Sequence, residues 1–346
     1  MREKSPDLKL EDFRYDAKLF KQAYNAGLKL KEIEQGQKRK KKLILFGGSI
    51  LSLLLFFFIL FLLRTPLFTS ISYIEAKSSE QVFTSVNYSS PVSSISRLEE
   101  FDGEFVDAKS VLYADLSTGE ILYAKNIDEP VYIASITKLM STLVALREFE
   151  LTEVVEVKKD WFAEENMSWS LGLDKGDTIT VETLLNGMLI SSYNDAAFAL
   201  ADHMEGGWEV FVDEMNSYTQ TLGLEDTHFY NPAGLDDYGA SISTGKDLFR
   251  LSTVLYRNKF IMETVNKSYE ELGCDIGDKK IYTTNMILNQ YGNIGGKTGQ
   301  TEMAGGCFLG ITDDGKVTIL LNTENRFDET IKLLTELKPK STTCFF

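Results

Sequence analysis

The sequence predicts an α+β domain preceded by one N-terminal transmembrane helix. Three observations favour this class: a long apolar segment near the N-terminus, strand pairs at both ends of the region that follows, and helical periodicity between those pairs. We divide the chain into a cytoplasmic tail at 1–42, a transmembrane helix at 43–63, a linker at 64–100 and a globular domain at 101–346.

The segment 43–63 contains 21 residues without a charged side chain, and it is apolar on every face. As an α-helix it would span roughly 30 Å, the thickness of a bilayer core. Five consecutive basic residues at 38–42 precede it, whereas only Arg64 follows it closely, so the N-terminus is expected in the cytoplasm. The apolar run and the tail are too long for a cleaved signal peptide. We therefore expect a single-pass anchor in the cell membrane and an extracytoplasmic domain.

The net charge of −15 hides an asymmetry between the two sides of this segment. Residues 1–42 carry 13 Lys and Arg against 7 Asp and Glu, a net charge of +6, which leaves −21 for the rest. An acidic exterior argues against a general nucleic-acid binder. Two histidines, and three cysteines without a Cys-x-x-Cys pair, argue against a metal centre and a disulfide scaffold. We expect no metal and no cofactor.

The linker at 64–100 contains ten serines in 37 residues and few charges, which is typical of a flexible spacer. The domain after it opens and closes with hairpin patterns, in which turn residues separate two apolar runs. The paired runs are 110–114 with 121–124, and 307–311 with 317–321. The predicted helical stretches are 135–149, 181–204 and 326–337, and the polar residues 192–194 are expected to interrupt the second of them. Strands at both ends with helices between predict that the terminal hairpins share one sheet.

Three short motifs stand in order within the domain. They are Ser135-Ile136-Thr137-Lys138, Ser192-Tyr193-Asn194 and Lys297-Thr298-Gly299. Each is weak alone, because Ser-x-x-Lys recurs at Ser243–Lys246 and Ser-x-Asn recurs at Ser85–Asn87. Their order, their spacing of 57 and then 105 residues, and their surroundings make the combination specific.

The first motif suits nucleophilic catalysis. Ser135 and Lys138 share one face of a helix because they are three residues apart. A serine hydroxyl attacks only after a base removes its proton, and a lysine serves as that base when burial or a second cation lowers its pKa. Lys297 is the candidate second cation. The backbone N–H of Ser135, at the start of a helix, is suited to stabilise an oxyanion. The alternative is a helix N-cap beside a solvated lysine.

The other two motifs suit proton relay and substrate binding. Ser192 would bridge the two lysines and pass a proton to the leaving group, while Asn194 would orient the base and hold a substrate amide. Lys297 and Thr298 offer a cation and a hydroxyl to a substrate carboxylate, and Gly299 lets a substrate backbone approach closely. The alternatives are a polar loop between helices and a glycine-rich turn.

With its surroundings, this set of motifs resembles the penicillin-recognising serine enzymes, and within them the low-molecular-weight D-alanyl-D-alanine carboxypeptidases. The resemblance covers about 105–337. The segments that carry it are 132–140, 188–197, 231–236 and 296–301. It implies a β-lactamase/transpeptidase-like fold, in which an antiparallel sheet flanked by helices lies beside a helical lobe.

The resemblance also implies a reaction. Ser135 would attack the penultimate D-Ala carbonyl of a peptidoglycan stem peptide ending in D-Ala-D-Ala, the terminal D-Ala would leave, and water would hydrolyse the acyl-enzyme. The oxyanion hole would be formed by the backbone N–H groups of Ser135 and Gln300. Penicillins and other β-lactams would acylate Ser135 as covalent inhibitors.

The sequence departs from the family pattern at two positions near the site. Tyr193 replaces a small residue, which is expected to narrow the cleft or alter the substrate range, and Ile133 replaces a common proline. Three alternatives remain open. A β-lactamase is disfavoured because Thr227 stands four residues before Asn231, where a water-activating Glu would be expected. The others are a DD-transpeptidase and a catalytically silent module that binds cell-wall peptides.

Overall fold

The structure is a computed structural model that describes residues 105–161, 169–273, 277 and 279–337. Its strands are β1 (Ser110–Asp115), β2 (Ile121–Lys125), β3 (Val131–Tyr132), β4 (Val154–Glu156), β5 (Thr178–Thr180), β6 (Ile242–Ser243), β7 (Tyr269–Leu272), β8 (Lys279–Tyr282), β9 (Asn293–Thr301), β10 (Gly305–Thr312) and β11 (Lys316–Thr323). Its helices are α2 (Lys138–Glu148), α3 (Val181–Ile190), α4 (Asn194–His203), α5 (Trp208–Leu222), α6 (Gly245–Leu255), α7 (Lys259–Val265) and α8 (Arg326–Glu336), with 3₁₀ turns η2 (Ala134–Thr137) and η4 (Asp236–Tyr238).

The predicted terminal hairpins form one antiparallel sheet. Its five strands lie in the order β2-β1-β11-β10-β9, so the first and last hairpins meet where β1 pairs with β11. The two hairpins and their shared sheet are as the sequence predicts. In addition, residues that the sequence allowed to be a glycine-rich turn form β9, which pairs with β10 and lies at one edge of the sheet.

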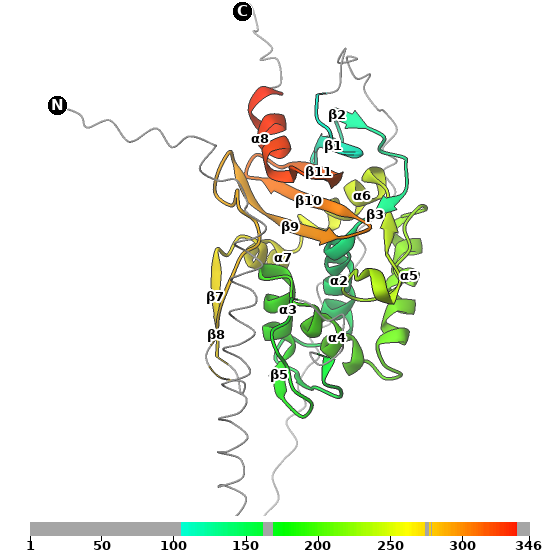
Figure 1. Cartoon of the computed structure of the whole chain (residues 1–346), viewed down its shortest axis with the longest axis vertical. Helices are drawn as coiled ribbons and strands as arrows, with labels where there is room; N and C mark the ends of the chain where they lie inside the picture. Colours follow the sequence, from blue (N-terminus) through cyan, green and yellow to red (C-terminus); the bar gives the residue numbers. More distant parts are fainter. Residues whose placement is uncertain (1–104, 162–168, 274–276, 278, 338–346) are drawn as a thin grey trace, which may run out of the picture. The chain divides into compact units, whose positions relative to one another are not determined.

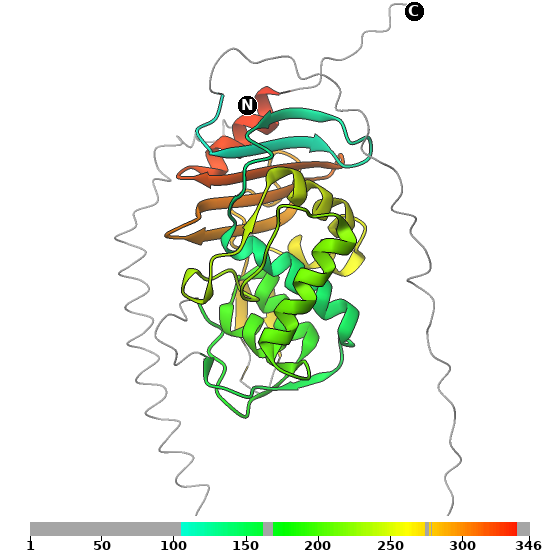
Figure 2. The same ribbon diagram turned by 90° about the vertical axis from the view of Figure 1, so that its right-hand side faces the viewer.

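The two faces of the sheet are covered by different helices. On β1, Val111 and Tyr113 pack in a small cluster with Leu333 of α8, whereas Leu112 and Ala114 belong to the main core. This alternation is the period of a strand whose two faces are both buried. The helix α8 therefore covers one face, and α6 and the helical lobe lie on the other (Figures 1 and 2).

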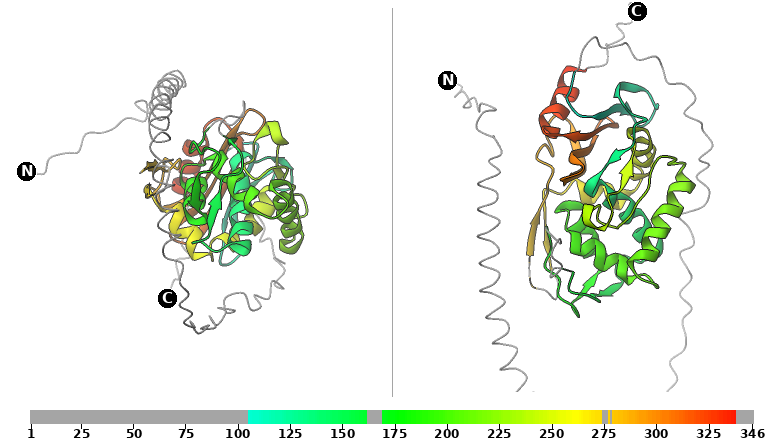
Figure 3. Two further views of the ribbon diagram at one scale, coloured as in Figure 1. Left: turned by 90° about the horizontal axis from the view of Figure 1, so that it is seen from below. Right: turned by 45° about the vertical axis from the view of Figure 1, so that its right-hand side comes forward.

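The helical lobe contains α2, α3, α4 and α5, with the β7–β8 hairpin beside α3 (Figure 3). The helical stretch predicted at 181–204 consists of two helices, α3 and α4, separated by Ser191 to Tyr193. Ser192 has φ of +62°, a left-handed conformation that an α-helix cannot include. The predicted interruption of this helical stretch at the Ser192-Tyr193-Asn194 motif is therefore confirmed.

In the described part of the chain, no helix is both long and apolar enough to cross a bilayer. The predicted membrane segment at 43–63 lies outside the described residues, as do the tail at 1–42 and the linker at 64–100. Of the three cysteines, Cys307 is buried in β10, as expected for a core residue, and the other two also lie outside the described residues.

Candidate active site

The candidate nucleophile, Ser135, lies in the 3₁₀ turn η2, which leads directly into α2. The turn keeps residues three apart aligned. As a result, Nζ of Lys138 lies 2.8 Å from Oγ of Ser135. Ser135 is partly exposed, whereas the residues on both sides of it in the turn are buried. The serine is therefore reachable from solvent and the lysine is not.

Lys138 is fully buried, and its Nζ lies within hydrogen-bonding distance of three oxygens. Besides Ser135 these are Oδ1 of Asn194 at 2.8 Å and the carbonyl oxygen of Ala233 at 2.7 Å. Burial, and then the cation of Lys297, hold the pKa of Lys138 well below its usual value of 10.5, against the opposing charge of Asp195. A neutral amine donates to Asn194 and Ala233 and keeps its lone pair for the hydroxyl proton of Ser135.

The carbonyl of Ala233 is fixed by a tight loop around Asn231. Oδ1 of the buried Asn231 accepts the N–H groups of Ala233, Gly234 and Leu235 at 3.1, 2.7 and 3.1 Å. Gly234 has φ of +75°, and an added Cβ there would lie 2.0 Å from the carbonyl oxygen of Ala134. Only glycine fits at this position. No sequence pattern indicated that a main-chain carbonyl would contact the base.

The second lysine, Lys297, projects from the edge strand β9 and is also buried. Its Nζ donates to Oγ of Ser192 at 2.7 Å and to the carbonyl oxygen of Thr298 at 2.9 Å. Burial, and then the charge of Arg326, lower its pKa from 10.5 to about 7. Ser192 thus contacts one lysine and Asn194 contacts the other. The Ser-x-Asn motif as a whole connects the two lysines, whereas the sequence predicted that Ser192 alone would bridge them.

The middle residue of that motif, Tyr193, lies between the turn and the core. Its backbone N–H donates to the carbonyl of Gly187 at 3.1 Å, and its half-buried ring packs beside α3. Burial raises the pKa of its hydroxyl. Much of the extra bulk at this position is therefore accommodated against α3.

The rest of the third motif runs along β9 beside the nucleophile. Oγ1 of Thr298 lies 2.6 Å from Oγ1 of Thr284. An added Cβ on Gly299 would lie 2.9 Å from the carbonyl oxygen of Ile133 and 3.2 Å from the backbone nitrogen of Ser135. Glycine at 299 therefore allows the edge strand to approach the backbone of the nucleophile closely.

Sequence reasoning missed Arg326, the first residue of α8. Its Nη1 donates to the carbonyl oxygen of Gly299 and to Oε1 of the exposed Gln300, both at 2.9 Å. This guanidinium adds a positive charge near Lys297. The sequence contains one signal for it, because a cation at the start of a predicted helix opposes the helix dipole and is unfavourable there unless another group compensates.

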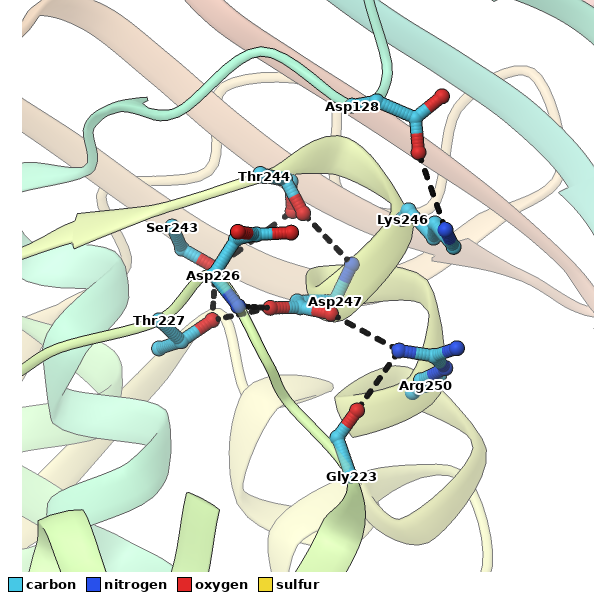
Figure 4. Close-up of polar contacts among 9 residues, drawn as sticks. All are labelled: Asp128, Gly223, Asp226, Thr227, Ser243, Thr244, Lys246, Asp247 and Arg250. Atoms are coloured by element: carbon cyan, nitrogen blue, oxygen red, sulfur yellow. Dashed lines mark hydrogen bonds and ion pairs between the residues drawn. The ribbon is translucent and has the colours of Figure 1, made fainter. Parts of the chain in front are cut away.

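The second Ser-x-x-Lys sequence has a structural role (Figure 4). Oγ of Ser243 lies 2.7 Å from Oγ1 of Thr227, and Lys246 reaches outward to Asp128 at 3.1 Å. The buried carboxylate of Asp247 accepts the hydroxyl of Thr227 at 2.9 Å. The second Ser-x-Asn sequence, at 85–87, lies outside the described residues.

Residues 99–325 match the family described as D-alanyl-D-alanine carboxypeptidase, Peptidase_S11. The chain is 36% identical over 211 residues to the D-alanyl-D-alanine carboxypeptidase DacB2 of Mycobacterium tuberculosis, an alignment that spans 60% of this chain and 71% of that protein. Against DacC of Escherichia coli the identity is 32%, and the match spans 61% of the relative's length.

Solved structures agree with this assignment. A D-alanyl-D-alanine carboxypeptidase from M. tuberculosis H37Rv is similar with a TM-score of 0.62 and 30% identity, covering 68% of this chain and 92% of that one. Penicillin-binding protein D2 of Listeria monocytogenes, in its cefotaxime-bound form, has a TM-score of 0.58 and 33% identity, covering 66% and 96%. The chain belongs to the D-alanyl-D-alanine carboxypeptidase family of serine peptidases.

Proposed function

We propose that the protein is a membrane-anchored serine D-alanyl-D-alanine carboxypeptidase that trims the terminal D-Ala from peptidoglycan stem peptides through an acyl-enzyme. One observation carries the proposal: the buried amine of Lys138 lies 2.8 Å from Oγ of Ser135, and its pKa is held low. A neutral amine at that distance is a general base for the hydroxyl. The alternative of an N-cap beside a solvated lysine does not fit, because Lys138 is buried.

In the acylation step, Lys138 takes the proton of Ser135 while Oγ attacks the carbonyl carbon of the penultimate D-Ala. The oxyanion forms beside the backbone N–H groups of Ser135 and Gln300, because Gly299 lets β9 lie close to the nucleophile. The bond to the leaving nitrogen then breaks. Ser192 donates its hydroxyl proton to that nitrogen and takes a proton from Lys297, its neighbour at 2.7 Å, so acylation leaves Lys138 with one proton more and Lys297 with one proton fewer. When water hydrolyses the acyl-enzyme, Lys138 returns its extra proton to Oγ of Ser135 and the water supplies a proton to Lys297.

The terminal carboxylate of the substrate would bind near the two basic side chains beside β9. Lys297, Thr298 and Arg326 supply two cations and a hydroxyl within a few residues of one strand edge. Charge-assisted hydrogen bonds from such groups favour a substrate with a free C-terminus. This local field would attract an anionic substrate although the domain is acidic overall.

The same geometry supports covalent binding of β-lactams at Ser135 with slow turnover. Thr227, where a β-lactamase-like pattern would place a Glu, points into the buried cluster with Ser243 and Asp247. Asn231 is occupied with three backbone N–H groups. Neither residue offers a carboxylate to activate a deacylating water, so we expect a stable penicilloyl enzyme.

The proposed location is the cell membrane, with the N-terminus cytoplasmic and the domain outside. It is supported by the uncharged segment 43–63 and the basic residues that precede it. The test is protease treatment of intact cells, followed by detection of tags at both ends. Loss of the C-terminal tag alone is expected, and protection of both tags would contradict the proposed orientation.

The activity is tested by incubating the full chain with a pentapeptide ending in D-Ala-D-Ala and measuring free D-alanine. Release that is absent in the Ser135→Ala variant supports a carboxypeptidase. Transfer of the peptide to an added amine in place of release would indicate a transpeptidase. Rapid penicillin hydrolysis without D-alanine release would indicate a β-lactamase, and peptide binding without either reaction would indicate a silent module.

A further inference from the structure

Ser192 has a backbone conformation that depends on its surroundings. Its φ is +62°, in the left-handed region, which is unfavourable for a residue other than glycine. Its Oγ nevertheless lies 2.7 Å from Nζ of Lys297. The contacts on both sides of residue 192 therefore determine whether this hydroxyl stays in place.

Trp169 contacts the turn on both sides of Ser192. Its indole Nε1–H donates to the carbonyl oxygen of Ser191, and its own carbonyl oxygen accepts the N–H of Asn194 at 3.0 Å. Trp169 is 39% exposed and itself has φ of +60°, so it is not placed there by burial in the core. One residue thus spans the turn from 191 to 194.

Asp195 holds the segment that carries Trp169. Its side chain is buried at the start of α4, where an isolated carboxylate would be strongly disfavoured. Its two oxygens accept four backbone N–H groups, those of Leu171 (2.7 Å), Gly172 (2.6 Å), Leu173 (3.0 Å) and Ala196 (2.9 Å). Three of the four lie outside α4, in the segment 169–173. Asp195 therefore does more than stabilise the end of its own helix.

These contacts form a continuous connection from Asp195, through the segment 169–173 and Trp169, to the turn at Ser192. We propose that Trp169 and Asp195 are positioning residues that hold Ser192 in its left-handed conformation, with its hydroxyl on Lys297. This inference rests on the proposed function of the site. It assigns roles to a carboxylate and an indole that the reaction itself does not use.

The matched controls come from the same helix. Asp202 of α4 accepts the indole N–H of Trp161 at 2.7 Å and, like Asp195, a backbone N–H, that of Trp208 at 3.2 Å. It lies seven residues further along, about 10 Å from Asp195 at the rise of an α-helix. Asp202→Asn and Trp161→Phe therefore repeat the same chemical changes away from the turn.

The experiment uses the full chain and a fluorescent penicillin. Endpoint labelling gives the fraction of active protein, and the rate constant at saturating penicillin gives the acylation step alone. For Asp195→Asn and Trp169→Phe we expect a normal labelled fraction and a rate constant lowered at least about tenfold, because a displacement near 1 Å can cost about 100-fold. Asp202→Asn and Trp161→Phe are expected to acylate at the wild-type rate.

A reduced labelled fraction with an unchanged rate constant would overturn the proposal, because it would show that these residues only stabilise the fold. Equal losses in the control variants would overturn it too. If Asp195→Asn does not fold, Trp169→Phe decides, since it keeps an aromatic ring and removes the indole donor with part of the ring, and Trp161→Phe controls for the smaller ring. Failure of the wild-type chain to label would instead refute the proposed function, so the two failures are distinguishable.

Discussion

The chain contains two Ser-x-x-Lys sequences, and the difference between them shows what the motif requires. Ser135 and Lys138 both lie in one helical path, from η2 into α2, so their side chains meet at 2.8 Å. Ser243 ends β6, whereas Lys246 lies in α6, so a strand-to-helix junction separates them. Ser243 turns inward to Thr227 while Lys246 turns outward to Asp128 (Figure 4). A serine and a lysine three residues apart are brought into contact by this spacing only where both lie on one helical path.

Burial separates the two lysines as well. Lys138 is fully buried near a second cation, which is the condition for a neutral amine. The side chain of Lys246 is 46% exposed and forms an ion pair with an exposed carboxylate. The second motif still contributes indirectly. Ser243 contacts Thr227, which lies at the start of a loop. At the end of the same loop, the carbonyl oxygen of Ala233 accepts a hydrogen bond from Lys138.

The largest expected effect comes from replacing each of the two serines by alanine. Ser135→Ala should abolish covalent labelling by a fluorescent penicillin, because the attacking oxygen is removed. Ser243→Ala should label fully and lose about 1–2 kcal/mol of unfolding free energy, because the buried hydroxyl of Thr227 loses one partner. Gel fluorescence and urea unfolding measure the two outcomes. Labelling of the Ser135→Ala protein would contradict the assignment of the nucleophile.

The next effect concerns the base. Lys138→Met keeps the length of the buried side chain and removes the amine, so the acylation rate constant should fall by about 10²–10⁴-fold. The measurement is the rate of penicillin labelling at saturating concentration, with the amount of folded protein checked by circular dichroism. Lys246→Met serves as the control and should acylate at the wild-type rate. A similar fall in both variants would mean that the comparison between the motifs is wrong.

The sequence predicted those parts of the site that depend on recognisable side-chain motifs and on regular secondary structure around them. Turn residues between apolar runs predicted the hairpins, and the order of three motifs predicted which side chains meet. The Ser192-Tyr193-Asn194 motif also predicted the interruption between α3 and α4, but the left-handed backbone of Ser192 and its contacts with the segment around Trp169 were not predicted, because that segment is distant from Ser192 in the sequence. The contact between Lys138 and the carbonyl oxygen of Ala233 was not predicted, because a contact made by a main-chain carbonyl leaves no pattern of residue types in the sequence.

A smaller effect is a shift in pH dependence. Lys297 has a pKa lowered to about 7, so its cation is present below that pH and lost above it. For a substrate with a free carboxylate, kcat/KM should fall as pH rises through about 7. Arg326→Gln removes a nearby positive charge that lowers this pKa, so the falling limb should move to higher pH.

The control for that shift is Arg250→Gln, which changes the same charge in the cluster around Asp247, where Nη1 of Arg250 contacts the carboxylate at 3.1 Å. Its pH profile should match that of the wild type. A profile of Arg326→Gln that moved to lower pH, or did not move, would show that Arg326 does not set the charge state of Lys297.

The smallest expected effect is that of Lys246→Gln. The ammonium lies 3.1 Å from Asp128, but the two side chains are 46% and 73% exposed, so water and salt screen the pair. Such pairs contribute about 0–1 kcal/mol. Urea unfolding should therefore detect a change of at most about 0.5 kcal/mol, with unchanged D-alanine release. A large loss of activity would mean that Lys246 affects the active site around Ser135. A null result would show that the same residue type, at the same spacing from a serine, matters only where burial removes its charge.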